Sequence, residues 1–291
     1  MTLDPGKGLT ASTLTMADGR TLRYVHAGEG DPVVVFEAGL SACASEWVAV
    51  QRLVAATTRT VSYDRAGHAG STTDTQPRSL MRICEDLHAL IEHVSPDEPV
   101  VFVAHSWGGP MVRCYADQHP DRVAGVVMVD TTTTAVMPEK TAKMSATMMS
   151  AALALHSVGL AKPILGRALF KNAGPELSAD DRAVIERDVT SKQSAKTAVA
   201  EAKAIPGSLA LMARWEQAGL PDVPVISVMG AGTGRGAKVR TTLITGAQKE
   251  MANHAQGECR VIDGTDHYVP QDKPRETAEA IVDVVQKVRQ G

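Results

Sequence analysis

The chain has 291 residues, which is enough for one large α/β domain or for such a domain with an inserted lobe. Its formal net charge is −3 and only 3% of its residues are aromatic, so no basic surface for nucleic acid is expected. The four cysteines are scattered and no HExxH motif occurs, which predicts free thiols, no metal and no cofactor. The polar first residues predict no signal peptide and a cytoplasmic protein.

Strands and helices alternate through the first 130 residues. Two short strands at 13–16 and 21–26 are joined by Asp18-Gly19, a dipeptide typical of hairpin turns. Apolar, β-branched runs then predict buried strands, and amphipathic segments predict the helices between them. The strands are expected at 33–36, 60–63, from 100 and at 124–129, and the helices at 46–56, 78–93 and up to about 119.

Between Thr131 and about Pro221 the pattern is helical without a convincing strand, with breaks at Pro163, Gly174-Pro175 and Pro206-Gly207. Alternation resumes with strands at 225–228 and 260–262 and helices at 239–255 and 274–289. Such alternation predicts a mostly parallel sheet covered on both faces. We therefore expect a core of residues 1–130 and 222–291 and a helical cap, or lid, of residues 131–221.

One stretch of the expected cap carries no charge, from Met144 to Ala161. It is barely as long as a membrane-spanning helix of about 20 residues, and it is rich in Ser, Thr and Ala. A helix packed on the rest of the protein is the favoured interpretation. Weak docking on a membrane surface stays an alternative, and no stable membrane span is expected.

The segment Ala104-His105-Ser106-Trp107-Gly108 joins an apolar strand to a helix. Small residues stand two before and two after the serine, as a very tight turn requires. Such a turn, called a nucleophile elbow, raises the Ser106 hydroxyl above the sheet, as is typical of a catalytic nucleophile. The amide of Trp107, at the start of the helix, is a candidate donor to an oxyanion.

Reactive groups on an open parallel sheet gather at the carboxyl ends of its strands. His267 follows the last strand there and is the candidate general base. The acid that orients it is harder to place, because the loop after the strand at 225–228 has no carboxylate. Asp222 lies at the wrong edge and Asp266 adjoins the histidine. Asp130, at the end of its strand, is favoured, and Asp263 is the alternative.

A second oxyanion donor is expected from the loop at residues 37–41. Gly39 allows the backbone to approach closely, and the amide of Leu40 is the best placed donor. A backbone donor requires no particular side chain, so the sequence alone does not test this choice.

Together these residues resemble the α/β-hydrolase superfamily, and they are most similar to its capped bacterial esterase and lipase-like members. The resemblance covers nearly the whole chain and rests on the elbow, the order Ser106, Asp130, His267, and the Asp64-Arg-Ala-Gly loop. It implies an α/β-hydrolase fold with an eight-stranded sheet. Three departures stand out: Ala38-Gly39 replaces the usual His-Gly, Ala104 replaces the first elbow glycine, and the acid is missing from its common place.

The predicted activity is hydrolysis of small carboxylic esters with an apolar acyl or alcohol part, through an acyl-enzyme on Ser106. Relatives with an aspartate nucleophile, such as epoxide hydrolases and dehalogenases, are disfavoured because a serine stands there. A cofactor-free C–C hydrolase or perhydrolase, a hydrolase-fold binding protein and a membrane-surface lipase remain alternatives. The expected cap carries many apolar residues, most of which should form its own core while some face the pocket beneath it. They are Met137, Met144, Met148, Met149, Leu153, Leu155, Leu160, Ile164, Leu165, Leu169 and Phe170.

Overall fold

The computed structural model describes residues 3–157, 166–167, 169–232 and 237–291. Eight strands form one sheet in the order β1-β2-β4-β3-β5-β6-β7-β8, and this confirms the predicted eight-stranded, mostly parallel sheet. Pairing is antiparallel only between β1 and β2 and between β2 and β4. The strands are β1 Thr10–Thr15, β2 Thr21–Ala27, β3 Val34–Glu37, β4 Thr60–Tyr63, β5 Val100–His105, β6 Val123–Val129, β7 Val225–Gly230 and β8 Gly257–Ile262.

The middle of the sheet is made of apolar, β-branched strands that are buried on both faces, as parallel strands under helices must be. Every residue of β3, β4, β5 and β7 is buried. The register pairs Phe36 with Val103 and Val103 with Val127, so the carboxyl ends of β3, β5 and β6 lie side by side. Loops that leave these three strands therefore meet at one edge of the sheet.

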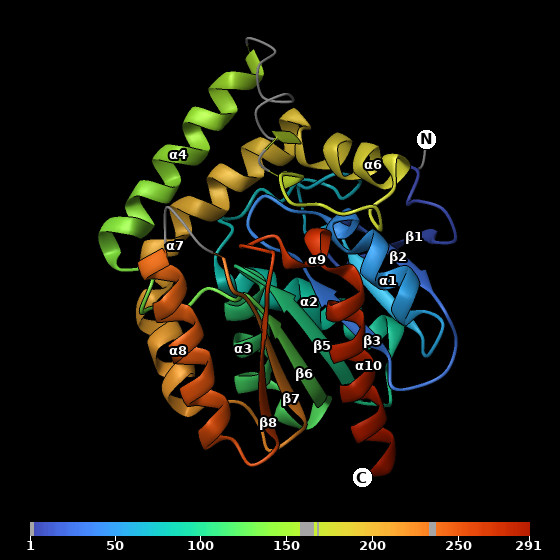
Figure 1. Cartoon of the computed structure of the whole chain (residues 1–291). Helices are drawn as coiled ribbons and strands as arrows, with labels where there is room; N and C mark the ends of the chain where they lie inside the picture. Colours follow the sequence, from blue (N-terminus) through green and yellow to red (C-terminus); the bar gives the residue numbers. More distant parts are fainter. Residues whose placement is uncertain (1–2, 158–165, 168, 233–236) are drawn as a thin grey trace.

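Helices cover both faces (Figure 1). On one face, α1 and α10 bury Val50, Val54 and Ile281 against β3, β5, β6 and β7. On the other face, α2 and α3 pack through Leu87 and Met111. The helices beside the sheet are α1 Val48–Val54, α2 Leu80–Val94, α3 Gly108–Gln118, α8 Ala237–Asn253, α9 Val269–Asp272 and α10 Pro274–Gln290.

Between β6 and β7 the chain forms α4 Glu139–Ser157, α6 Ala179–Val189 and α7 Lys192–Ala218, which lie over the carboxyl ends of the strands (Figure 1). The predicted break at Pro206-Gly207 is wrong, because α7 runs through Pro206. A proline removes one backbone donor and disfavours a helix interior. Here the buried Ala202, Ile205 and Met212 anchor α7 in the core on both sides of Pro206.

Several boundaries differ from the prediction. The first strand begins at Thr10 because Thr10 already pairs with His26, and the last begins at Gly257 because it pairs with Val225. The helix expected from residue 46 is preceded by a 3-10 turn, Ala44–Trp47. Short helix α9 was not predicted. At the carboxyl edge, β4, β6 and β8 end where predicted, whereas β3 and β7 end one and two residues later, at Glu37 and Gly230.

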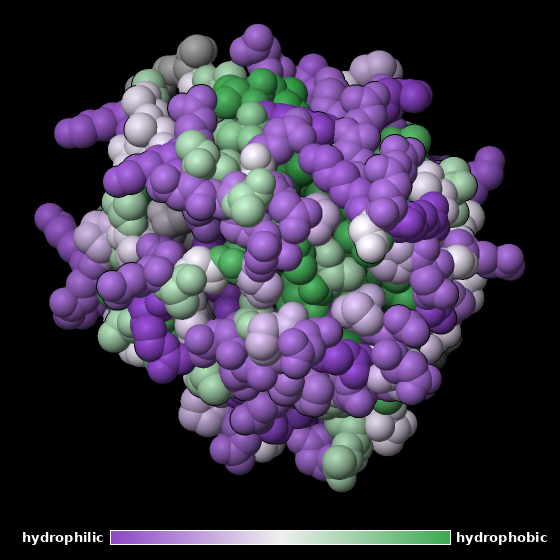
Figure 2. Space-filling model, turned by 90° about the horizontal axis from the view of Figure 1, so that it is seen from below, coloured by the Kyte–Doolittle hydropathy of each residue, from purple (hydrophilic) through white to green (hydrophobic). Residues whose placement is uncertain are grey.

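In the part of the chain that the structure describes, no helix combines the length and apolarity needed to cross a bilayer. On α4, Met144 and Met148 are more than half exposed, so they belong neither to a cap core nor to a closed pocket. The predicted cap residues Leu160, Ile164 and Leu165, and the predicted break at Pro163, lie outside the described residues. The end of the molecule that faces away from α4 and α6, seen from below in Figure 2, is mostly hydrophilic, with a central strip of hydrophobic residues.

Candidate active site

Ser106 lies in the turn between β5 and α3, with φ of +50°. This left-handed conformation is rare and strained outside glycine, and here the surrounding hydrogen bonds maintain it. The Ser106 amide donates to the Val129 carbonyl at 3.2 Å, and the Ser106 carbonyl accepts from Gly109 and Thr132. A Cβ on Gly108, two residues after Ser106, would lie 2.5 Å from the Glu37 carbonyl oxygen, so only glycine fits at this position.

The structure brings Ser106, His267 and Asp130 together. His267 Nε2 lies 2.9 Å from Ser106 Oγ, and His267 Nδ1 lies 2.6 Å from Asp130 Oδ2. Because a carboxylate only accepts, the proton of the neutral imidazole sits on Nδ1 and Nε2 is free to accept from the serine hydroxyl. These distances would allow the imidazole to take a proton from the Ser106 hydroxyl while the carboxylate orients the ring.

Asp130 follows β6 directly and is almost fully buried, with φ of +46°. Its other oxygen, Oδ1, accepts from the Arg240 guanidinium of α8 and from the Gly230 amide at 3.4 Å. Burial alone would raise the pKa of Asp130, but the hydrogen bonds and charges of His267 and Arg240 outweigh it and lower that pKa. Asp263, the alternative acid, is exposed, and no bond joins it to the His267 ring.

The loop at residues 37–41, here called the oxyanion loop, lies against the elbow. A Cβ on Gly39 would be 3.3 Å from the Ser106 Cβ. Among the described residues, no protein group accepts from the amides of Leu40 or Trp107, whereas the Gly39 amide donates to Glu46 Oε2 at 2.9 Å. Both predicted donors are therefore free for a substrate oxygen, although their role stays a prediction.

Glu46 and His105 are site residues that the sequence interpretation missed. Glu46 Oε1 lies 2.8 Å from His105 Nδ1, and His105 Nε2 lies 2.8 Å from the His267 backbone oxygen. Both side chains are buried. Nothing in the sequence around Glu46 signals its partner 59 residues away.

A second buried network joins the oxyanion loop to α7. Arg65 Nη1 donates to Glu37 Oε1 at 2.9 Å and to the Ala38 carbonyl, and Nη2 donates to the Gly39 carbonyl at 2.8 Å. Its Nε and Nη2 also donate to the two oxygens of Glu201. One guanidinium thus holds the strand end, the loop and the inserted helix α7.

The charges of this network respond to burial and to each other. Burial raises the pKa of Glu37 despite the nearby Arg65 cation. For Glu201, burial also favours the neutral acid, but the positive charges of Arg65 and His68 outweigh it and hold its pKa well below the ordinary range. Glu201 is therefore the carboxylate that balances Arg65 most directly.

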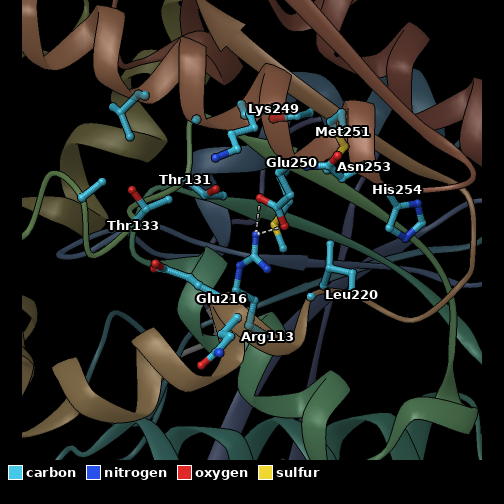
Figure 3. Close-up of a pocket in the computed structure, with 18 of the residues that line it drawn as sticks. Arg113, Thr131, Thr133, Glu216, Leu220, Lys249, Glu250, Met251, Asn253 and His254 are labelled. Atoms are coloured by element: carbon cyan, nitrogen blue, oxygen red, sulfur yellow. Dashed lines mark hydrogen bonds and ion pairs between the residues drawn. The ribbon is translucent and has the colours of Figure 1, made fainter.

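A cavity of about 650 Å³ lies on the side of the sheet covered by α3 and α8 (Figure 3). It contains the ion pair between Arg113 of α3 and Glu250 of α8, at 2.6 Å, and Thr131 forms part of its wall. Ser106 and His267 do not line it. The cavity is therefore separate from the candidate catalytic residues, although its wall includes Thr131, the residue after Asp130.

The described residues contain no cluster of His, Cys, Asp or Glu that could hold a metal. Cys43, Cys84, Cys114 and Cys259 are all unpaired. Burial raises the pKa of the Cys43 thiol, which disfavours the reactive thiolate.

The family model described as the alpha/beta hydrolase family matches residues 34–280, most of the chain. The chain belongs to this family. Its sequence is 30% identical, over 119 residues, to the "Bifunctional esterase/perhydrolase DCH" of Acinetobacter calcoaceticus, covering 40% of this chain and 43% of that protein. The curated relatives match over 16 to 43% of their own lengths, so their activities are not transferred to this chain as a whole.

Solved structures share the fold over nearly the whole chain. An esterase from Thermogutta terrifontis is 17% identical with a TM-score of 0.70, covering 96% of this chain and 99% of that one. An epoxide hydrolase from Vigna radiata is also 17% identical, with a TM-score of 0.78 and coverage of 97% and 99%. At such identities the likeness concerns the fold, and enzymes of different chemistry share it.

Proposed function

We propose that the protein is a serine hydrolase that cleaves carboxylic esters through an acyl-enzyme on Ser106. The supporting observation is the chain of hydrogen bonds from Ser106 Oγ to His267 Nε2, at 2.9 Å, and from His267 Nδ1 to Asp130, at 2.6 Å. A serine hydroxyl is a weak nucleophile until a base takes its proton, and His267 lies at the distance such a transfer requires.

In this mechanism Ser106 Oγ attacks the ester carbonyl carbon and its proton passes to His267 Nε2. Negative charge develops on the carbonyl oxygen, where the amides of Leu40 and Trp107 donate to it. The tetrahedral intermediate collapses, the C–O bond to the alcohol breaks, and His267 gives its proton to the leaving oxygen. Water, deprotonated by His267, then attacks the acyl-enzyme and releases the acid and Ser106.

Asp130 stays ionised through the cycle and stabilises the imidazolium of His267. Its lowered pKa supports this role, because the carboxylate form persists well into acidic pH. Arg240 supplies a second hydrogen bond to the same carboxylate. Asp130 is therefore preferred to Asp263 as the triad acid.

We also propose that residues 131–221 act as a cap over this site and favour an apolar acyl or alcohol part. Leu40 is half-buried beside Ser106, and Met137 and Met149 of the inserted segment pack against the same apolar cluster that contains Trp107. Methionine side chains adapt to varied apolar shapes. Poorer turnover of aliphatic esters than of charged ones would contradict this substrate class.

The test is labelling by a fluorophosphonate probe, with hydrolysis of a short and a medium p-nitrophenyl ester. Labelling confined to Ser106 and lost in Ser106→Ala is expected. Hydrolysis should be lost in Ser106→Ala and His267→Ala and should fall by about 10³- to 10⁴-fold in kcat in Asp130→Asn. Asp263→Asn is the matched control and should stay active. A wild type that neither labels nor hydrolyses esters would contradict the proposal and favour a binding protein.

Perhydrolysis is the second candidate, favoured by the likeness to the Acinetobacter esterase/perhydrolase. The same acyl-enzyme would be attacked by hydrogen peroxide instead of water, giving a peracid. A peracid assay with hydrogen peroxide on wild type and Ser106→Ala measures it. The cytoplasmic location inferred from the sequence also stays a prediction, which fractionation of expressing cells would test.

A further inference from the structure

A second carboxylate–imidazole pair lies behind the candidate triad. The Glu46 and His105 side chains are only 5% and 2% exposed, and the ring centroids of His105 and His267 are 4.8 Å apart. Three hydrogen bonds of 2.8 to 2.9 Å link Gly39 N to Glu46, Glu46 to His105, and His105 to the His267 carbonyl. The pair thus contacts the oxyanion loop and the loop of His267, and its histidine is the last residue of β5, next to Ser106.

The partners of His105 determine its protons. The His267 carbonyl only accepts, so His105 Nε2 carries a hydrogen. Nδ1 faces the Glu46 carboxylate, so the two groups share one further proton. Burial disfavours both charges, but mutual attraction outweighs it, raising the pKa of His105 and lowering that of Glu46. Both shifts favour the imidazolium–carboxylate form of the pair, which is linked at each end to a backbone group.

We infer that Glu46 and His105 are positioning residues that hold the oxyanion loop and the His267 backbone in place around Ser106. This inference rests on the proposed ester hydrolysis for its kinetic consequence, but the contacts themselves do not depend on it. Both side chains are buried, so we place neither in contact with the substrate.

The first consequence concerns the oxyanion loop. The Gly39 amide is used by Glu46, so the next amide, of Leu40, is the one left to donate. A Cβ on Gly39 would lie only 3.2 Å from His105 Nδ1, so the loop rests directly on the pair. Oxyanion donors act only at about 2.7 to 3.1 Å from the developing charge, so small loop shifts are costly.

The second consequence concerns His267, whose side chain is 39% exposed. An exposed base depends on its backbone for its position. The hydrogen bond from His105 Nε2 to the His267 carbonyl fixes the His267 backbone, while the bond from Nδ1 to Asp130 orients its ring. Loss of either contact should shift the His267 imidazole away from Ser106.

Three substitutions of Glu46 separate geometry from charge. In Glu46→Gln the amide oxygen accepts from Gly39 and the NH₂ group donates to a neutral His105, which still donates to the His267 carbonyl. Glu46→Asp keeps the charge but is one methylene too short to make both bonds. Glu46→Leu keeps the volume and removes both bonds. Glu250→Gln, in the ion pair with Arg113 away from the site, is the matched control.

The kinetic readout is kcat for a p-nitrophenyl ester per fluorophosphonate-labelled site, so unfolded protein is not counted. We expect kcat within about fivefold of wild type for Glu46→Gln, and about 10- to 100-fold lower for Glu46→Asp and Glu46→Leu, with KM changed little. The control should match wild type. An Asp variant that is as fast as the Gln variant would overturn the positioning role.

Hydrogen exchange gives a readout independent of activity. The amides of residues 37–41 and 264–268 should exchange faster in Glu46→Asp and Glu46→Leu than in wild type. Their exchange rates should be unchanged in Glu46→Gln and Glu250→Gln. Unchanged exchange in all variants would overturn the inference even if the wild type proved inactive on esters. Conversely, if the wild type hydrolyses esters and all Glu46 variants have the same kcat as the wild type, the positioning role is wrong and the proposed function is unaffected.

Discussion

At the scale of single residues, two non-glycine residues in the left-handed region end adjacent strands, Ser106 after β5 and Asp130 after β6. Their backbones are tied together, because the Ser106 amide donates to Val129 and the Ser106 carbonyl accepts from Thr132. Strained backbone is common at functional sites, where neighbouring contacts maintain it. The side chains of both residues are thereby presented to His267.

Gly108 gives the residue-scale prediction. In Gly108→Ala the new methyl group would overlap the Glu37 carbonyl oxygen, at 2.5 Å, and press on the Ala38 carbonyl, at 3.0 Å. The oxyanion loop would move away from Ser106, so kcat should fall by about 10- to 100-fold.

The matched control is Gly207→Ala in α7, where an added Cβ meets nothing within 4 Å. Alanine is favoured over glycine in a helix by about 1 kcal/mol, so this variant should be slightly more stable and equally active. Steady-state kinetics and urea unfolding of both variants check the pair. Equal kcat for the two would contradict the tight contact at Gly108.

At the scale of elements, the Arg65–Glu201 pair attaches α7 to the oxyanion loop. Removing one partner of a buried pair leaves an uncompensated charge and costs about 3 to 5 kcal/mol. Glu201→Gln should therefore lower the free energy of unfolding by about 3 kcal/mol at pH 7. Glu279→Gln, on exposed α10 surface, is the control and should change it little.

The same variant predicts a pH dependence. The pKa of Glu201 is lowered by folding, so its stabilising effect is complete above the ordinary glutamate pKa of about 4.3 and is lost as the pH falls further. The stability difference between wild type and Glu201→Gln should thus be constant from pH 7 to 5 and shrink below about pH 4.5. Urea unfolding at several pH values measures it, and a difference independent of pH would exclude this ion pair as its source.

At the scale of the whole molecule, the sheet has an apolar layer on each face, with Leu87 of α2 in one and Ile281 of α10 in the other. Both side chains are fully buried. Leu87→Ala and Ile281→Ala should each lower the free energy of unfolding by about 2 to 5 kcal/mol through lost burial and a cavity. Val239→Ala, half exposed on α8, should cost far less.

Because both side chains are apolar members of the core layers and form no hydrogen bond with the candidate site, kcat per labelled site should stay close to wild type in both core variants. Thermal unfolding and active-site titration measure the two effects separately. A large loss of kcat at full labelling would show that the scaffold and the site are coupled more tightly than the contacts indicate.

Much of this architecture was predictable because it rests on local pattern. Apolar runs such as 100–105 identify buried strands, and parallel strands present their carboxyl ends at one edge, which is where Ser106, Asp130 and His267 meet. The contacts of Glu46, Arg65 and Arg240 were not predictable. They join residues that are distant in sequence and that no spacing rule relates, and only the packed structure shows them.

Asp130, the proposed acid, precedes the inserted helices in the chain, and this has an evolutionary consequence. Asp130 lies 24 positions after Ser106. The segment between them contains α3, a 3-10 turn at Pro120–Arg122 and β6, and the whole insertion lies downstream of both residues. Changes in the length or make-up of the insertion therefore leave the spacing of this pair untouched and need only preserve the return to β7 and the contact of α7 with Arg65. Such a chain is modular: recombination could exchange the inserted helices without changing the spacing of Ser106 and Asp130.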